Sequence, residues 1–184
     1  LNDLTRETVH VSMYAGGRLS TIVVIDSPRT TRAHVDNGME LPFNATASGL
    51  CWLAFSSSSL AEPHLSADFA QYQRGTLTDR EAIEHTLDQI RTQGYGVAER
   101  SFDDDVSSVA VPIFGASGEV WGCMSLACVA SRMTPDLIVE YSALVMNAAT
   151  AVTQALGATI PKSYQTSRRA ASAVRSQTHT DLKD

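Results

Sequence analysis

The feature that most constrains the fold of this chain is a pair of glycine-bearing turns, each lying between two runs of β-forming residues. The turns are Ala15–Arg18 and Gly115–Gly118. Glycine tolerates the positive φ that tight hairpins need, so each turn is expected to join two antiparallel strands. The strands expected from these runs are Thr8–Met13, Leu19–Ile25, Val106–Phe114 and Glu119–Ala127.

The first hairpin has a readable burial pattern. Val9 and Val11 fall on one face of the first run, and His10 and Ser12 fall on the other. Such alternation predicts a strand that is buried on one face only. The second run, Leu19–Ile25, is rich in β-branched residues and is expected to be more deeply buried.

Other segments add weaker strands and clear helices. Thr30–Val35 and Tyr95–Ser101 are expected to be strands, which brings the sheet to about six. Apolar residues recur at helical spacing over Thr46–Phe55 and again over Thr134–Gly157, where Thr-Pro provides a helix start.

Capping-box spacing marks two further helix starts. Ser59 precedes Glu62 by three residues, although Pro63 limits how long that helix can be. Thr78 stands in the same relation to Glu81, and a glycine follows where that helix should end.

The order of elements predicts an α+β fold: a curved antiparallel sheet with flanking helices in two layers and a long C-terminal helix. Residues 1–157 are expected to form one domain. Residues 158–184 form a basic Ser/Thr/Arg-rich tail, in which Arg168–Arg175 could be a short helix.

The charge is distributed unevenly along the chain. Residues 1–157 contain nine arginines, no lysine and eighteen acidic residues, a net charge of −9, whereas residues 158–184 have a net charge of +3. A body this acidic is a poor electrostatic partner for a phosphate backbone, so direct DNA binding by it is not expected.

The sequence favours a cytoplasmic location. Its three cysteines form no short-loop disulfide framework, and its longest nearly uncharged apolar run, Val120–Ala130, is too short to cross a membrane. No basic stretch leads into a hydrophobic segment at the N-terminus. The chain begins at Leu1 rather than Met, so a preceding segment is expected to be missing.

No catalytic or metal-binding constellation is visible. The cysteines, Cys51, Cys123 and Cys128, lie in apolar stretches where a structural thiol is expected. The histidines lack the spacing of metal ligands, and Asp103–Asp105 lacks the alternating ligands of a calcium loop. We therefore expect no enzyme, metal or cofactor; catalysis through Cys51, Cys123 or Ser125 is the alternative.

Two serines lie in apolar stretches, where a buried hydroxyl needs a hydrogen-bond partner. Ser125 is central in an apolar strand, and Ser48 lies near a helix start. No Gly-x-Ser-x-Gly motif surrounds either of them. Each hydroxyl bonds either to the backbone or to a bound small molecule, and the sequence leaves both open.

A series of segments points to one family. Residues 4–10, LTRETVH, are similar to a TGETVHL opening, and residues 38–49, GMELPFNATASG, to a motif of the form LPLHATAxG. The further segments are Val24–Pro28, Gly94–Val97, Val109–Ile113, Gly118, Met124–Leu126 and Arg132–Thr134. Together, from about residue 4 to about residue 157, they resemble the C-terminal effector-binding domain of the IclR family of bacterial transcription regulators.

The resemblance implies a GAF-like fold, with helices on one side of the sheet and a ligand pocket on the other. It implies a domain that binds a small organic-acid effector and assembles as a homodimer or a dimer of dimers. DNA would be bound by an N-terminal winged helix-turn-helix domain, which has no counterpart in this sequence, and no membrane would be involved.

The resemblance also assigns the pocket residue by residue. Ala47 and Ser48 begin a helix whose backbone N–H groups can hold an anion, and Ser125 and Ala127 face them from a strand. The implied effector-binding positions are Ala33, Leu41, Ala47, Ser48, Ala98, Val106, Ser108, Ser125 and Ala127.

The chain departs from the family pattern at positions that bear on the effector. Alanine stands at position 98, where some members have an acid, and at position 127, where serine is usual, while Asn44 replaces a histidine. Ala98, Val106 and Ala127 together predict a larger and less polar effector, such as an aromatic or alicyclic acid. The competing interpretation is an oligomerisation module with a vestigial pocket.

Overall fold

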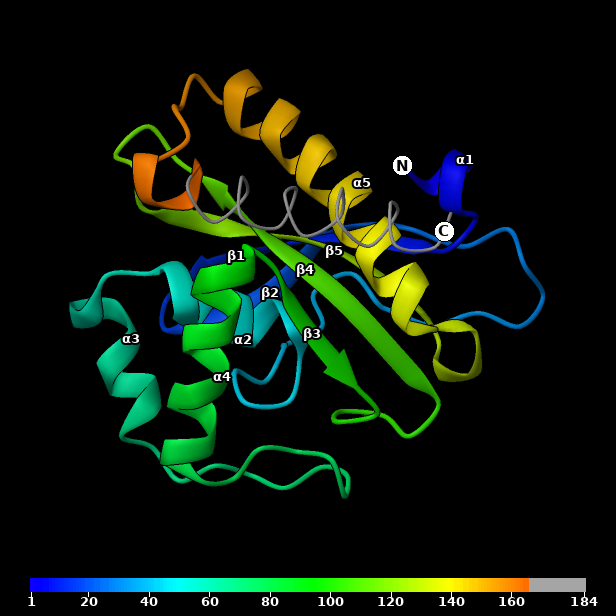
Figure 1. Cartoon of the computed structure of the whole chain (residues 1–184), viewed down its shortest axis with the longest axis horizontal. Coiled ribbons are helices and arrows are strands. Elements are labelled where there is room, and N and C mark those ends of the chain that lie inside the picture. The colour runs from blue at the N-terminus through cyan, green and yellow to red at the C-terminus, as the bar shows by residue number, and fades with distance from the viewer. Residues whose placement is uncertain (166–184) are drawn as a thin grey trace, which may run out of the picture.

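The computed structural model describes residues 1–165, which contain one antiparallel sheet of five strands in the order β2-β1-β5-β4-β3 (Figure 1). The strands are β1 (Thr8–Ala15), β2 (Arg18–Ile25), β3 (Gly96–Glu99), β4 (Val106–Phe114) and β5 (Val120–Val129). The helices are α1 (Asn2–Thr5), α2 (Ala47–Phe55), α3 (Ser58–Leu65), α4 (Arg80–Gln93), the 3-10 turn η1 (Ala130–Arg132) and α5 (Pro135–Ala155). The expected α+β class with a long last helix is confirmed.

Helices cover both faces of the sheet. Helix α5 packs on β4 and β5 from one side, while α2 packs on β3, β4 and β5 from the other, with α4 behind it (Figure 1). The expectation of helices on one side and a pocket on the other is therefore wrong. The physical reason is that both faces of β4 and β5 carry small or apolar side chains, so each face needs a covering layer.

Burial along the first hairpin also differs from expectation. His10 and Ser12 are as buried as Val9, so β1 is covered on both faces. Strand β2 is the more exposed of the pair, because it lies at the edge of the sheet and leaves Val23 and Ile25 about half exposed. Periodicity shows which side chains share a face, but it does not show what covers that face.

The segment 30–35 is irregular, so the expected third strand is wrong. Its backbone bonds to side chains instead of to a strand: the Thr8 hydroxyl donates to the Ala33 carbonyl at 2.8 Å. Most of the segment is exposed, with Ala33 alone fully buried. Part of the free edge of β2 is taken by the segment 38–41 instead, through an isolated bridge between Ser20 and Glu40 and backbone bonds to Leu19 and Thr21.

The helix starts are confirmed in two cases and shifted in two. Thr46 and Thr134 cap α2 and α5 through their side chains. Helix α4 is capped by Asp79, whose carboxylate accepts from the Ala82 N–H at 2.9 Å, rather than by Thr78. In α3, Ser59 is already helical, so the expected capping box is absent there.

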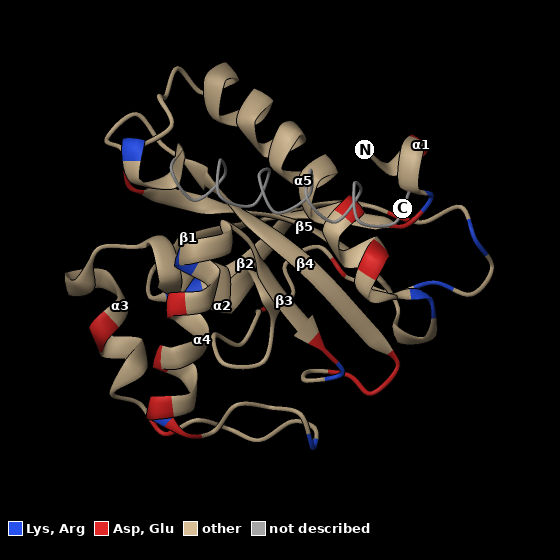
Figure 2. Ribbon diagram, in the orientation of Figure 1, with Lys and Arg blue, Asp and Glu red and all other residues tan. Residues whose placement is uncertain are grey.

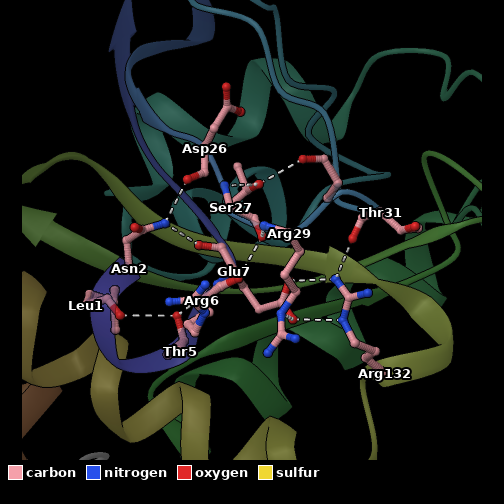
Figure 3. Close-up of polar contacts among 12 residues, drawn as sticks. Leu1, Asn2, Thr5, Arg6, Glu7, Asp26, Ser27, Arg29, Thr31 and Arg132 are labelled. Atoms are coloured by element: carbon pink, nitrogen blue, oxygen red, sulfur yellow. Dashed lines mark hydrogen bonds and ion pairs between the residues drawn. The ribbon is translucent and has the colours of Figure 1, made fainter.

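A buried carboxylate joins the N-terminal segment to the region before α5 (Figure 3). Glu7, 1% exposed, accepts two hydrogen bonds of 2.8 Å from Arg132, and Arg29 lies 3.4 Å away. Arg132 also donates to the Thr31 carbonyl at 3.2 Å. The bonds to Glu7 raise the pKa of the Arg132 guanidinium, and together with the bond to Thr31 they fix the loop after β2 against η1.

The chain remains packed on the body after α5. Residues 162–165 are helical, and Tyr164 is buried between Phe55 and Phe114 with its hydroxyl donating to the Gly94 carbonyl at 2.9 Å. The domain boundary at residue 157 stays a prediction, and the short helix expected at 168–175 lies outside the described residues. Within residues 1–165, none of the helices combines the length and the apolar character needed to span a bilayer.

Candidate functional site

A cavity of about 610 Å³ opens on the α2 face of the sheet. Its floor comes from β1, β4 and β5, its inner wall from the start of α2, and its rim from the loops before α2 and after β3. The lining residues are His10, Thr31, Arg32, His34, Val35, Met39, Leu41, Ala45, Thr46, Ala47, Ser48, Ala98, Ser101, Phe102, Asp103, Asp105, Val106, Ser108, Ala127 and Val129.

Small side chains on the sheet make room for this cavity. Ala127 of β5 pairs with Thr8 of β1 on one side and with Ser108 of β4 on the other, so it lies in the middle of the floor. Ala98 of β3 pairs with Ser108 and continues the floor outwards. Larger side chains at these alanines would fill the space, so the cavity depends on them directly.

The start of α2 supplies hydrogen-bond donors. The Thr46 hydroxyl accepts from the Gly49 N–H at 3.0 Å, which leaves the N–H groups of Ala47 and Ser48, in the first turn, without a partner inside the helix. The positive end of the helix dipole lies at the same place. This end of the cavity therefore suits an anionic or carbonyl oxygen.

Glycine allows the turn that presents this helix start. A Cβ on Gly49 would lie 2.5 Å from both the Cα of Phe43 and the carbonyl oxygen of Pro42, which is closer than van der Waals contact allows. The Thr46 hydroxyl donates to the same Pro42 carbonyl at 2.8 Å. The segment before α2 is thus folded back tightly on the helix, which brings Leu41 and Ala45 to the cavity wall.

Two serine hydroxyls connect the helix to the sheet beneath the cavity. The Oγ atoms of Ser48 and Ser125 are 2.5 Å apart, and both residues are almost fully buried. Because each hydroxyl carries one proton, one of them donates to the other, and the acceptor keeps its own proton to donate. The sequence left backbone and ligand partners open for these hydroxyls; the structure shows a side-chain partner instead.

His10 is the one histidine on the cavity floor. It is 5% exposed, and its Nδ1 is buried without a hydrogen-bond partner among the described residues. Burial lowers the pKa of His10 to about 4, so its imidazole is neutral near pH 7. A neutral imidazole has one N–H donor and one acceptor nitrogen.

Charged side chains lie only at the exposed rim. Arg32, His34, Asp103 and Asp105 line the cavity there. Figure 2 shows acidic residues along the loop that joins β3 to β4. The Oδ1 of Asp103 accepts from the Asp105 N–H at 2.8 Å, so this carboxylate bonds to the backbone of its own loop. Among the described residues, the acidic side chains that line the cavity are Asp103 and Asp105, both of them on this rim.

The structure brings most of the predicted site residues together. The seven that line the cavity are Leu41, Ala47, Ser48, Ala98, Val106, Ser108 and Ala127. Ser125 lies beneath the lining, bonded to Ser48. Ala33 is buried next to two rim residues but does not line the cavity, and its carbonyl accepts from Thr8. Whether these residues bind an effector stays a prediction.

Sequence reasoning missed His10 and most of the rim. The available signal for His10 was its place on the polar face of an alternating strand, together with Ser12. That face was taken to meet solvent, whereas it meets α2 and the cavity. The rim residues come from irregular loops, where periodicity carries no information about direction.

The other candidate centres have surroundings that disfavour chemistry. Burial raises the pKa of the Cys51 thiol well above its ordinary value and that of Cys128 to about 11, which lowers the thiolate fraction. Cys123 is also buried and donates to the Ser48 carbonyl at 3.4 Å. Within residues 1–165, no three of the His, Cys, Asp and Glu side chains gather where they could hold a metal.

Comparison with known proteins gives a consistent result. The family model described as "Bacterial transcriptional regulator IclR C-terminal" matches residues 1–154. The HTH-type transcriptional regulator KdgR of Escherichia coli is 29% identical over 160 residues, which cover 85% of this chain and 60% of KdgR. This chain thus spans less than two thirds of the length of that relative.

Solved structures agree with the sequence comparison. The crystal structure of the C-terminal domain of Escherichia coli KdgR superposes with a TM-score of 0.75 and 27% identity, covering 85% of this chain and 91% of that domain. The crystal structure of Thermotoga maritima IclR gives a TM-score of 0.80 and 27% identity, covering 84% of this chain and 63% of that one.

Proposed function

This chain belongs to the IclR family of bacterial transcription regulators, whose C-terminal regulatory domain it matches, and from that premise we propose that it senses a small organic acid in the cytoplasm. The observation that carries the proposal is the cavity at the start of α2, which is lined by Ala47 and Ser48 with their free N–H groups, while the Ser125 hydroxyl bonds to that of Ser48 beneath the lining. A carboxylate is the common biological group that matches such a set of donors.

The size and lining of the cavity support a ring-containing acid. A volume of about 610 Å³ lies within the usual range for small-molecule sites and exceeds what a two- or three-carbon acid fills. Ala98, Ala127, Val106 and Leu41 give the space beyond the donors an apolar wall. We therefore propose an aromatic or alicyclic acid as the effector.

The effector would act on DNA binding by another part of the regulator. The KdgR relative is named as a helix-turn-helix regulator and extends beyond the region matched here. We propose that the acid favours one of two arrangements of the assembled regulator, and that these arrangements differ in DNA affinity. The shift it can produce is limited by its difference in affinity for the two arrangements.

A thermal-shift measurement with named acids tests the proposal. Benzoate, its three monohydroxy derivatives and cyclohexanecarboxylate are added to the purified domain, and a bound acid at 100 times its Kd should add about 2.7 kcal/mol of stability. The blocking variant is Ala98→Phe, which fills the cavity from β3. The matched control is Glu99→Phe, which adds the same ring to the same strand at an exposed position on the opposite face.

The two variants separate the outcomes. A shift that is lost in Ala98→Phe and kept in Glu99→Phe supports a sensor that uses this cavity. A shift that survives in Ala98→Phe places the binding site elsewhere. If none of these acids stabilises the domain, the proposed class of effector is wrong.

A second candidate function is oligomerisation, and one specific observation favours it. Strand β2 is an edge strand, and its Ile22, Val23 and Ile25 are 41%, 47% and 51% exposed. An apolar edge with unpaired backbone groups pairs readily with another strand. We propose that a second copy of this chain covers it, as homodimers or dimers of dimers require, whether or not the cavity is also used.

A further inference from the structure

The loop that joins α3 to α4, residues 66–79, supports the rim of the cavity from outside (Figure 1). None of its residues, all of which the structure describes, lines the cavity. The Thr76 hydroxyl nonetheless donates to the Ser101 carbonyl at 2.5 Å, and the rings of Tyr72 and Phe102 lie edge to face with their centres 5.2 Å apart. Because Ser101 and Phe102 both line the cavity, the position of this loop bears on the shape of the rim.

The side chain of Asn44 closes this loop. Its Nδ2 donates to the Ala70 carbonyl at 2.9 Å and to the Leu77 carbonyl at 2.8 Å, one on each arm of the loop. Asn44 is 5% exposed and directly precedes Ala45 and Thr46, which line the cavity. One buried amide thus connects the segment before α2 with the loop that supports the rim.

The chemistry of the amide explains why this position can close the loop at two points. The nitrogen of an asparagine side chain has two hydrogens, so a single atom donates to both carbonyls. An ionised aspartate has no hydrogen to donate, and a neutral imidazole has one. Among side chains of about this size, only the primary amide of asparagine satisfies both carbonyls at once.

We propose that Asn44 is a positioning residue of the cavity, which holds the loop 66–79 closed and thereby fixes Ser101 and Phe102 at the rim. Neither Asn44 nor the loop lines the cavity, so the expected consequence is a change in how readily a ligand enters and leaves. Loops beside a site commonly control these steps. That consequence rests on the proposed function, because it takes the cavity to bind a small molecule, whereas the positioning of the rim does not.

The first test needs no ligand. Amide NMR spectra report the surroundings of each residue, so the signals of residues 100–106 report the rim. Asn44→His leaves one donor for two carbonyls, and Asn44→Asp leaves none near pH 7. The matched control is Asn147→Asp, which makes the same chemical change at an exposed position of α5, on the other face of the sheet.

The expected result is a graded displacement of the rim. The signals of residues 100–106 should shift in Asn44→His, shift further in Asn44→Asp, and stay in place in Asn147→Asp. Shifts confined to the neighbours of position 44 and to the loop 66–79 would mean that the amide has a purely local role. That result would overturn the inference, as would equal shifts of the rim signals in the control.

A second variant interrupts the connection at its other end. Thr76→Val removes the hydroxyl that donates to Ser101, at nearly the same volume, and leaves in place the carbonyls to which Asn44 donates. If the loop transmits the effect, Thr76→Val shifts the same rim signals, and adding Asn44→His changes them little further. Additive shifts would show that position 44 reaches the rim by another route. This variant decides the inference even if Asn44→Asp fails to fold.

The consequence for binding is measured with benzoate and cyclohexanecarboxylate as probes, by line-shape analysis of the same spectra during titration. Asn44→His should raise both the association and the dissociation rate by about fivefold, the equivalent of one net hydrogen bond lost from the closed loop, with little change in Kd. A weaker Kd with an unchanged association rate would contradict control of entry. If neither acid binds the wild-type protein, the proposed class of effector is wrong and control of entry falls with it, whereas the ligand-free spectra still decide the positioning of the rim.

Discussion

His10 differs from an exposed histidine in a way that couples folding to pH. In the unfolded chain its pKa returns to about 6.5, whereas burial holds the pKa at about 4 in the folded protein. Between these values the unfolded state binds more protons, so stability falls as the pH falls from about 6.5 towards 4. We expect a contribution of about 3 kcal/mol that is present above pH 6.5 and lost by pH 4.

The variant His10→Phe isolates that contribution. Urea unfolding at several pH values between 7 and 4.5 should show a shallower loss of stability in His10→Phe than in the wild-type protein. Acidic residues elsewhere, including Asp103 and Asp105 on the rim, are common to both proteins and cancel in the difference. Identical slopes would mean that the imidazole is accessible to protons in the folded state.

The ion pair at Glu7 makes a second prediction at the scale of single residues. Arg132→Ala leaves a carboxylate that is 1% exposed with only Arg29, 3.4 Å away, as a cationic partner. We expect a loss of about 3 kcal/mol in the free energy of unfolding, because an uncompensated buried charge is costly. Arg132→Lys should recover only part of this, since an ammonium group does not form the paired hydrogen bonds of the guanidinium.

A double-mutant cycle checks the cause. The loss is assigned to the unpaired Glu7 carboxylate if Glu7→Gln combined with Arg132→Ala lowers the free energy of unfolding by clearly less than the sum of the two single changes. Additive losses would show that Arg132 stabilises the protein through its other bond, to the Thr31 carbonyl.

The cavity residues that could be predicted from the sequence are those that lie in segments resembling the family motifs. The resemblance supplied Ala47, Ser48 and Ala127, and the structure places all three at the cavity. His10 was not predictable, because a strand pattern shows which residues share a face and not which layer covers it. The packing of α2 on the sheet is a property of the assembled fold, so no local pattern in β1 contains it.

At the scale of elements, the tight turn before α2 requires a glycine at position 49, inside the helix. Gly49→Ala would ordinarily stabilise a helix by up to about 1 kcal/mol. Here the added Cβ would meet Pro42 and Phe43 backbone atoms at 2.5 Å, so we expect a net loss of about 2 kcal/mol. Urea unfolding measures the loss.

Gly115→Ala is the matched control for that change. A Cβ at Gly115 would have the Trp121 Cβ as its nearest neighbour, at 3.6 Å, which is an ordinary contact. We expect its stability to stay within about 0.5 kcal/mol of the wild-type value. Equal effects of the two substitutions would show that the backbone at Pro42 and Phe43 moves easily.

Helices and strands that have a clear pattern or capping residue in their own sequence were predicted correctly. Segments whose structure depends on the elements packed beside them were not. Val106–Phe114 is the strand that its pattern indicates, and Thr134 and Gly94 bound their helices as expected. Segment 30–35 was expected to be a strand but is a loop, because its carbonyls at Thr31 and Ala33 bond to side chains and residues 38–41 bond to β2 in its place. Whether a segment becomes a strand depends on an available partner, which is not a local property.

At the scale of the whole molecule, the sheet extends beyond the helix that covers it. Helix α5 packs on β4 and β5, whereas Val23 and Ile25, which pair with Val11 and Val9 of β1, remain about half exposed. Apolar side chains left uncovered beside an edge strand are typical of an interface between subunits. The fold therefore predicts where a second copy would bind, although neither composition nor the family motifs indicated it.

The variant Val23→Glu/Ile25→Glu tests that interface, with Tyr72→Glu, which is 42% exposed on a loop before α4, as the control. We expect the double variant to weaken self-association by at least about a hundredfold, because two like charges would meet their symmetry mates in a desolvated contact. Sedimentation equilibrium measures this directly, and unchanged association would place the interface elsewhere. The same variant separates the two proposed functions: a dissociated protein that still gains stability from an acid contains a complete sensor in one subunit.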